Sequence, residues 1–286
     1  EHNAVTRVLE YYKNKKIIDV NIITVSPEYV YDNEKIKYQF NDKKPDLLIM
    51  SHASNVTGLI APVEKIASLA REYRAITIID MAQTAGLIDI NVGLEDIDFA
   101  IFAGHKTLYA PTGISGFVMN QTLCLEPVLF GGTGYDSANQ EMPSEIPERF
   151  EIGTLNTQAI AGLNASLKWI EKIGIENLYE KEHMNREKLK KILNEYDFID
   201  IVGDSTDSHY IGIVSFLIKG ISSDSAATIF KDKDLAVRTG LHCAPLAHKF
   251  LGTFPAGTIR LSTSYFTREE DIDELITVLN YIEDNI

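Results

Sequence analysis

The chain has 286 residues, of which 45% are hydrophobic and 24% are charged, the balance of an ordinary globular protein. Its formal net charge of −14 repels nucleic acid and anionic lipid, and no local basic cluster offsets it, so neither nucleic acid nor a membrane surface is an expected partner. Two cysteines, Cys124 and Cys243, are too few for a disulfide framework, and no Cys/His cluster has zinc spacing. A cytoplasmic protein in a reducing compartment is therefore expected.

The first half of the sequence alternates short apolar runs with helical patterns. The runs predict buried strands at residues 17–25, 47–50, 76–79, 99–102 and 113–119. Pro62 begins a predicted helix, because apolar residues follow it at the 3.6-residue spacing. Near-continuous apolar strands separated by helices favour an α/β fold with a mostly parallel sheet and helices on both faces.

A loop-like, glycine-containing segment over residues 131–156 separates this pattern from the rest of the chain. We place the domain boundary just after it, which gives a large domain over residues 1–157 and a smaller α+β domain over residues 158–286. In the second domain the patterns predict helices at 158–172, 175–196, 223–231 and 269–283 and strands at 198–202, 211–217 and 257–262, with another leading into 237–238.

Polar residues follow three of the predicted strands. The first strand leads into Ser51-His52-Ala53-Ser54-Asn55, the second ends in Asp80 with Gln83 three residues on, and the third leads into Gly104-His105-Lys106. Ligands of an open parallel sheet bind outside the carboxyl ends of its strands, and right-handed crossovers place such ends side by side. One shared site is therefore expected.

A lysine and an aspartate at neighbouring strand ends suit pyridoxal 5'-phosphate, which needs an amine for its aldehyde and a carboxylate for its ring nitrogen. Lys106 is expected to form the Schiff base, for which a partly desolvated site favours the neutral amine. Asp80 is expected to pair with the pyridine nitrogen, Gln83 to donate to the ring oxygen, and His105 to meet the phosphate. Alone, such a lysine is usually solvated and such an aspartate usually caps a helix, so the combination carries the interpretation.

Longer motifs carry a resemblance to a known family. The strings that resemble the class V aminotransferase family, of the pyridoxal-phosphate-dependent fold type I, are Asp80-Met81-Ala82-Gln83, Gly104-His105-Lys106 and Pro111-Thr112-Gly113. Within that family, Arg238-Thr239-Gly240-Leu241-His242-Cys243-Ala244 resembles the active-cysteine loop of cysteine desulfurases. The short path from Cys243 to Arg260 resembles the group II branch, in which selenocysteine lyases also sit.

The resemblance implies roles for further residues. His2 would stack on the cofactor ring, and Lys106 would also move the proton on the substrate Cα. Asn55, Arg238 and Arg260 would bind the substrate, with Arg260 gripping its carboxylate. The remaining implied contact comes from Gly131-Gly132-Thr133, in which Gly132 and Thr133 would reach the phosphate of a neighbouring subunit. A homodimer is therefore implied.

Cys243 would be the nucleophile that takes sulfur from the substrate. A free cysteine is commonly a small buried hydrophobe, but Gly240, His242 and Pro245 surround this one with loop character. Cys124 lies between Leu123 and Leu125 without polar company, and we interpret it as structural.

The implied activity is conversion of L-cysteine to L-alanine, with a persulfide on Cys243 and transfer of the sulfur to an acceptor protein for iron–sulfur cluster or cofactor assembly. Alternatives that stay open are a selenocysteine lyase, another class V enzyme, and a non-catalytic remnant. Family members also carry a phosphate loop and an interior strand before the Glu1-His2-Asn3 motif. We therefore expect the large domain to be incomplete at its N-terminus and the natural protein to be longer.

Overall fold

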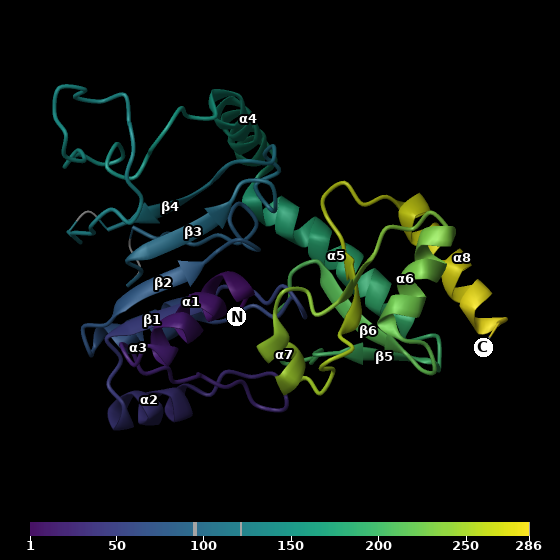
Figure 1. The fold of residues 1–286 in the computed structure, drawn as a ribbon. Helices are drawn as coiled ribbons and strands as arrows, with labels where there is room; N and C mark the ends of the chain where they lie inside the picture. Colours follow the sequence, from purple (N-terminus) through teal and green to yellow (C-terminus); the bar gives the residue numbers. More distant parts are fainter. Residues whose placement is uncertain (94–95, 121, 286) are drawn as a thin grey trace.

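The computed structural model describes residues 1–93, 96–120 and 122–285 (Figure 1). Within these residues the strands form two four-stranded sheets, one in each half of the chain. In chain order, the elements are α1 (Asn3–Asn14), α2 (Asn33–Asp42), β1 (Leu47–Ser51), α3 (Val63–Arg71), β2 (Ile76–Asp80), β3 (Phe99–Ala103), β4 (Ser115–Met119), α4 (Thr157–Ile173), α5 (Ile175–Leu193), β5 (Ile199–Val202), β6 (Ile213–Ile218), α6 (Ser223–Asp232), β7 (Arg238–Gly240), α7 (Pro245–Phe250), β8 (Thr258–Ser262) and α8 (Glu269–Glu283).

The first sheet has the order β1-β2-β3-β4. Strands β1, β2 and β3 run parallel, and β4 returns antiparallel to β3. The predicted mostly parallel sheet is thereby confirmed. In its register Ser51 lies beside Asp80, and Asp80 lies beside Ile101, so the polar segments after these strands meet at one edge of the sheet.

Helix α3 covers one face of this sheet, because its apolar side chains recur on a single stripe. Val63, Ile66, Ala67 and Ala70 on that stripe are completely buried. They join one core with Ile79 of β2, and burial of a side chain such as Ile66 contributes about 1.5–3 kcal/mol.

The second sheet has the order β5-β6-β8-β7 and is antiparallel throughout. Its core contains Phe216 of β6, Ile259 of β8, Phe230 of α6 and Leu279 of α8, all 0–1% exposed. The antiparallel pairing of β7 with β8 places Arg238 directly opposite Arg260. This pairing fixes two cations side by side.

Most predicted elements are confirmed to within a few residues, but the strand predicted at residues 17–25 is wrong. A strand needs a neighbour for its backbone hydrogen bonds. No strand pairs with this segment in the described structure, and the Ile22 carbonyl instead accepts from the Gln39 side chain at 3.1 Å. The division of the chain after residue 157 stays a prediction.

Three helices were missed by the sequence analysis, namely α1, α2 and α7. A signal for α2 was present in Asp32, whose side chain accepts the backbone N–H groups of Glu34 and Lys35 as a helix N-cap. In the part of the chain that the structure describes, no helix is both long and apolar enough to cross a membrane.

Candidate functional site

Lys106 lies in a tight turn directly after β3. The turn is closed by the N–H of Tyr109, which donates to the Lys106 carbonyl at 2.9 Å, and by the N–H of Ala110, which donates to the Gly104 carbonyl at 2.8 Å. A Cβ at Gly104 would lie 2.8 Å from the Ile114 carbonyl oxygen, so the turn requires glycine there. The backbone thus holds the lysine in a fixed position at the end of its strand.

The partly buried position of Lys106 favours the neutral, reactive form of its amine. Burial lowers its pKa, the Asp80 carboxylate opposes this, and Arg260 lowers it further. Asp80 is oriented by its own turn, because its Oδ1 accepts the N–H of Ala82 at 2.9 Å. The predicted meeting of Lys106 and Asp80 at one edge of the sheet is therefore present, with the amine shifted toward its neutral form.

His2 joins these two residues from the start of the chain. Its Nδ1 accepts the N–H of Ala4 at 3.0 Å and caps α1. Burial, then the nearby Lys106 charge, lowers its pKa, and Asp80 opposes the shift. The Glu1 carboxylate accepts from the backbone and side chain of Ser51, both at 2.8 Å, and so ties this segment to the end of β1. A neutral imidazole is thereby placed near both groups.

A cavity of about 150 Å³ lies between the two halves of the molecule. Gln83 and Lys106 line it from the first half, and Glu182 and Arg260 line it from the second. Gln83, Lys106 and Arg260 were expected at the site from the sequence, whereas Glu182 was not. Nothing in the sequence separates Glu182 from the other charged residues of α5, since its neighbours arrive only through the fold.

Arg260 has the features of an anion-binding group. Its guanidinium donates to the Asn55 carbonyl oxygen at 2.7 Å, while its buried Nε has no hydrogen-bond partner in the part of the chain that the structure describes. Burial, followed by the adjacent Arg238, lowers its pKa. Among the described residues no carboxylate pairs with either arginine. Two neighbouring cations without an acidic partner suit a ligand that carries a carboxylate.

Cys243 is exposed on a strained loop near this cation. His242 and Cys243 have φ values of 46° and 58°, and left-handed backbone at non-glycine residues costs on the order of 1–3 kcal/mol each. The loop is held by Asn55 Nδ2, which donates to the His242 carbonyl at 2.6 Å, and by the N–H of Asn3, which donates to the Cys243 carbonyl at 2.7 Å. A Cys243 thiolate would interact electrostatically with both Lys106 and Arg260. The thiol is thus exposed near Lys106 and Arg260 rather than packed in a core.

His105, Gly132 and Thr133 do not line the Lys106 cavity. His105 is exposed, and Gly132 and Thr133 line a separate cavity of about 610 Å³ that is formed by residues 130–143 and shares no residue with the Lys106 cavity. Their phosphate contacts stay predictions. Cys124, which we interpreted as structural, is exposed in the segment after β4. No cluster of three potential metal ligands is present among the described residues.

The sequence model of the class V aminotransferase family matches residues 1–275. The chain belongs to this family. Relatives of this class V aminotransferase chain include a probable cysteine desulfurase of Methanothermobacter thermautotrophicus, 30% identical over 93% of this chain and 67% of that protein. A cysteine desulfurase of Haloferax volcanii is 28% identical over 98% of this chain and 66% of its own length.

Solved structures agree with this family assignment. The apo structure of a cysteine desulfurase from Thermococcus onnurineus covers all of this chain and 71% of that one, with a TM-score of 0.91 and 29% identity. A cysteine desulfurase from Escherichia coli matches with a TM-score of 0.86 at 23% identity, which supports the fold alone. The fold is thus the α/β fold type I of pyridoxal-phosphate-dependent enzymes. The chain spans 56% to 67% of the length of the curated relatives that it matches.

Proposed function

We propose that this chain carries the active site of a cysteine desulfurase, which converts L-cysteine to L-alanine and passes the sulfur through Cys243 to an acceptor protein. The observation that carries the proposal is the exposed Cys243 on its strained loop, close to Lys106 and Arg260. A transaminase has no use for a thiol at this place. The names of the relatives point to the same reaction.

The residues present fit pyridoxal 5'-phosphate as the cofactor. When bound, this group supplies an electron sink for the bonds at the substrate Cα. Lys106 would hold its aldehyde, since burial favours the neutral amine that such a bond requires. Asp80 would hold the pyridine nitrogen, Gln83 would donate to the ring oxygen, and the neutral His2 would stack on the ring. His105, together with Gly132 and Thr133 of a second copy, would meet the phosphate.

Substrate recognition would come from the second half of the chain. Arg260, whose Nε has no partner among the described residues, and the adjacent Arg238 would bind the carboxylate of L-cysteine. Asn55 would orient that binding, because its carbonyl accepts from Arg260 while its side chain holds the Cys243 loop. Lys106 would then be the base that moves the proton at the substrate Cα.

The sulfur transfer would form a persulfide on Cys243. The Cys243 thiolate bonds to the substrate sulfur as the substrate C–S bond breaks, and a proton goes to the carbon that lost sulfur. The products are a persulfide on Cys243 and free L-alanine, without any external oxidant. Because Cys243 is exposed, an acceptor protein could take the outer sulfur atom.

A homodimer is part of the proposal. The segment before the glycine-rich loop exposes Val128 at 89%, Leu129 at 66% and Phe130 at 73%, an apolar surface that a second copy would cover. Sedimentation equilibrium tests this directly, and a monomer at micromolar concentration would exclude it.

Both cysteines are free, as suits the proposed cytoplasmic location.

The test of the function is alanine release from L-cysteine by the cofactor-loaded protein. We expect Cys243→Ala to abolish both alanine release in the presence of a reductant and the persulfide found by mass spectrometry. Cys124→Ala is the matched control, since that residue is also free and exposed, and it should retain full activity. Equal activity in the Cys243→Ala protein and the unmodified one would refute the role of Cys243. Release of alanine from selenocysteine alone would favour the lyase alternative.

A further inference from the structure

Tyr109 forms one rigid unit with the lysine turn. It lies three residues after Lys106 and donates its N–H to the Lys106 carbonyl at 2.9 Å. Its φ of 55° is left-handed, which a tyrosine adopts only when its surroundings hold it there. Its ring packs edge-on against Trp169 and Phe266, with centroid distances of 5.4 and 5.5 Å. Movement of the Tyr109 ring would therefore move Lys106.

The hydroxyl of Tyr109 links this unit to the second half of the chain. It donates to Glu182 Oε1 at 3.1 Å and accepts the backbone N–H of Tyr265 at 3.3 Å. Glu182 belongs to α5, and Tyr265 follows β8. One phenol thus joins the turn after β3 to helix α5 and to the segment that follows β8.

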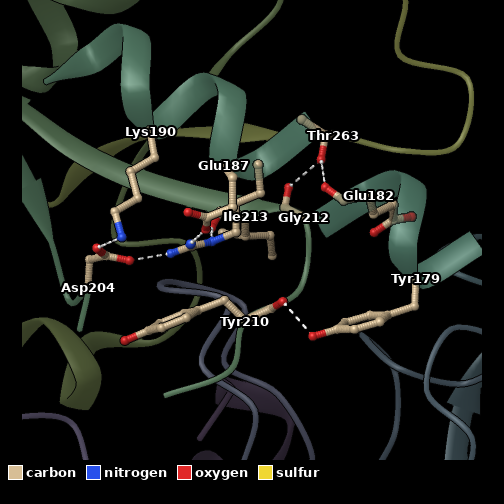
Figure 2. A network of polar contacts seen from close by, with 10 residues as sticks. Tyr179, Glu182, Glu187, Lys190, Asp204, Tyr210, Gly212, Ile213 and Thr263 are labelled. Carbon is tan, nitrogen blue, oxygen red and sulfur yellow. Dashed lines mark hydrogen bonds and ion pairs between the residues drawn. The ribbon is translucent and has the colours of Figure 1, made fainter. Parts of the chain in front are cut away.

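Glu182 in turn contacts the segment that continues the arginine strand. Its backbone carbonyl and that of Gly212 both accept from Thr263 Oγ1, at 3.3 and 3.2 Å (Figure 2). Thr263 immediately follows β8, the strand that carries Arg260. A Cβ added at Gly212 would lie 3.0 Å from Glu182 Oε2, so the carboxyl group packs closely against this backbone. Glu182 therefore lies between the lysine turn and the arginine strand, and it lines the same cavity as both residues.

Packing alone does not account for a carboxyl group at this place. Glu182 is 5% exposed and pairs with no cation among the described residues. Burial raises its pKa to about 7, and the hydrogen bonds from Tyr109 and Gly212 only partly oppose this. The charged groups that line the same cavity are Lys106 and Arg260, while the guanidinium of Arg186, one turn further along α5, is occupied by Asp204 and Glu187.

We propose that Tyr109 and Glu182 are positioning residues, whose hydrogen bond fixes Lys106 relative to Arg260 across the cavity. Its consequence for catalysis rests on the proposed desulfurase function, whereas its effect on the turn does not. An amine and a carboxylate-binding cation that act on one small substrate must keep their separation. The Tyr109–Glu182 bond joins the lysine turn to α5, and the Glu182 carbonyl joins α5 to Thr263 at the end of the arginine strand. The reaction would then slow when the bond is removed, without loss of substrate binding.

The test compares four variants of the cofactor-loaded protein: Tyr109→Phe, Glu182→Ala, Glu182→Gln and Tyr179→Phe. Tyr109→Phe and Glu182→Ala remove the bond, whereas Glu182→Gln keeps an acceptor for the Tyr109 hydroxyl. Tyr179→Phe is the matched control, because that α5 hydroxyl also donates a hydrogen bond, to the Tyr210 carbonyl at 3.4 Å, away from the lysine turn (Figure 2). Hydrogen exchange of the peptide over residues 104–110 reports on the turn, and the peptide of α8 reports whether the variant is folded.

We expect exchange over residues 104–110 to rise about tenfold in Tyr109→Phe and Glu182→Ala, with α8 unchanged. The kcat for alanine release should fall about tenfold in the same two proteins, while KM for L-cysteine changes less than about twofold. Glu182→Gln should restore both values, and Tyr179→Phe should alter neither. Unchanged exchange in Tyr109→Phe, or faster exchange with unchanged kcat, would overturn the proposal. If no version releases alanine, the proposed function fails and the exchange data alone decide whether the bond positions the turn.

Discussion

At the scale of single residues, several buried histidines lie around the site in their neutral form. His52 follows β1, is 3% exposed, and donates its backbone N–H to the Asp80 carbonyl at 2.9 Å. Burial lowers its pKa to about 4, and the pKa of His242 is lowered to about 3 by burial and then by Arg260. His242 Nε2 lies 2.9 Å from Thr258 Oγ1, so this imidazole ties the Cys243 loop to the start of β8. Neither side chain accepts a proton without a cost to the fold.

These shifts predict a loss of stability in mild acid. The unfolded chain protonates His52 near its ordinary pKa of 6.5, whereas the folded chain does so only near 4. The stabilising contribution of the neutral, buried His52 to the unfolding free energy is therefore complete above pH 6.5 and is lost as the pH falls toward 4. We expect His52→Leu to remove about 3 kcal/mol of the decrease in unfolding free energy between pH 7 and pH 4, measured by urea denaturation.

The exposed His209 provides the control for this experiment. His209→Leu should leave the pH dependence of the unfolding free energy as it is in the unmodified protein. If His52→Leu and His209→Leu gave the same pH dependence, burial of His52 would not be the cause of the acid sensitivity.

At the scale of elements, helix α5 is held to the second sheet by Arg186. This side chain is 2% exposed and donates to the Ile213 carbonyl at 3.2 Å and to Asp204 at 2.5 Å. Its guanidinium also lies 4.1 Å from the centroid of the Tyr210 ring. Because Glu182 lies one turn earlier on the same helix, the Arg186 contacts also fix the position of Glu182 at the cavity.

Replacement of this arginine should be costly. Arg186→Met would leave Asp204, which is 15% exposed at its side chain, with Lys190 as its remaining partner at 2.6 Å. Loss of one member of a buried ion pair costs about 3 kcal/mol or more, and we expect that decrease in the unfolding free energy from urea denaturation.

Lys188→Met on the same helix is the matched control. Lys188 pairs with Glu269 at the surface, where both side chains are at least 42% exposed, so its loss should cost less than about 1 kcal/mol. Equal destabilisation by the two substitutions would show that the buried network does not secure α5.

At the scale of the whole molecule, the sequence predicted well what local patterns determine. The apolar runs separated by helical patterns predicted the parallel strands. The rules of crossover connections predicted that Asp80 and Lys106 meet at one edge of the sheet. The segment over residues 17–25 failed because β-branched composition favours a strand only where a neighbour accepts its hydrogen bonds. The Tyr109–Glu182 bond could not be predicted, because its partners are 73 residues apart and neither stands in a recognisable motif.

The two halves of the chain build one pocket, and we propose that pyridoxal 5'-phosphate binds there to Lys106. The measurement that tests it most directly is an intact mass after incubation with this cofactor and reduction with borohydride, followed by peptide mapping. We predict one pyridoxyl adduct, located on Lys106, and none in Lys106→Ala. An adduct spread over surface lysines, or none on a chain that hydrogen exchange shows to be folded, would contradict the account.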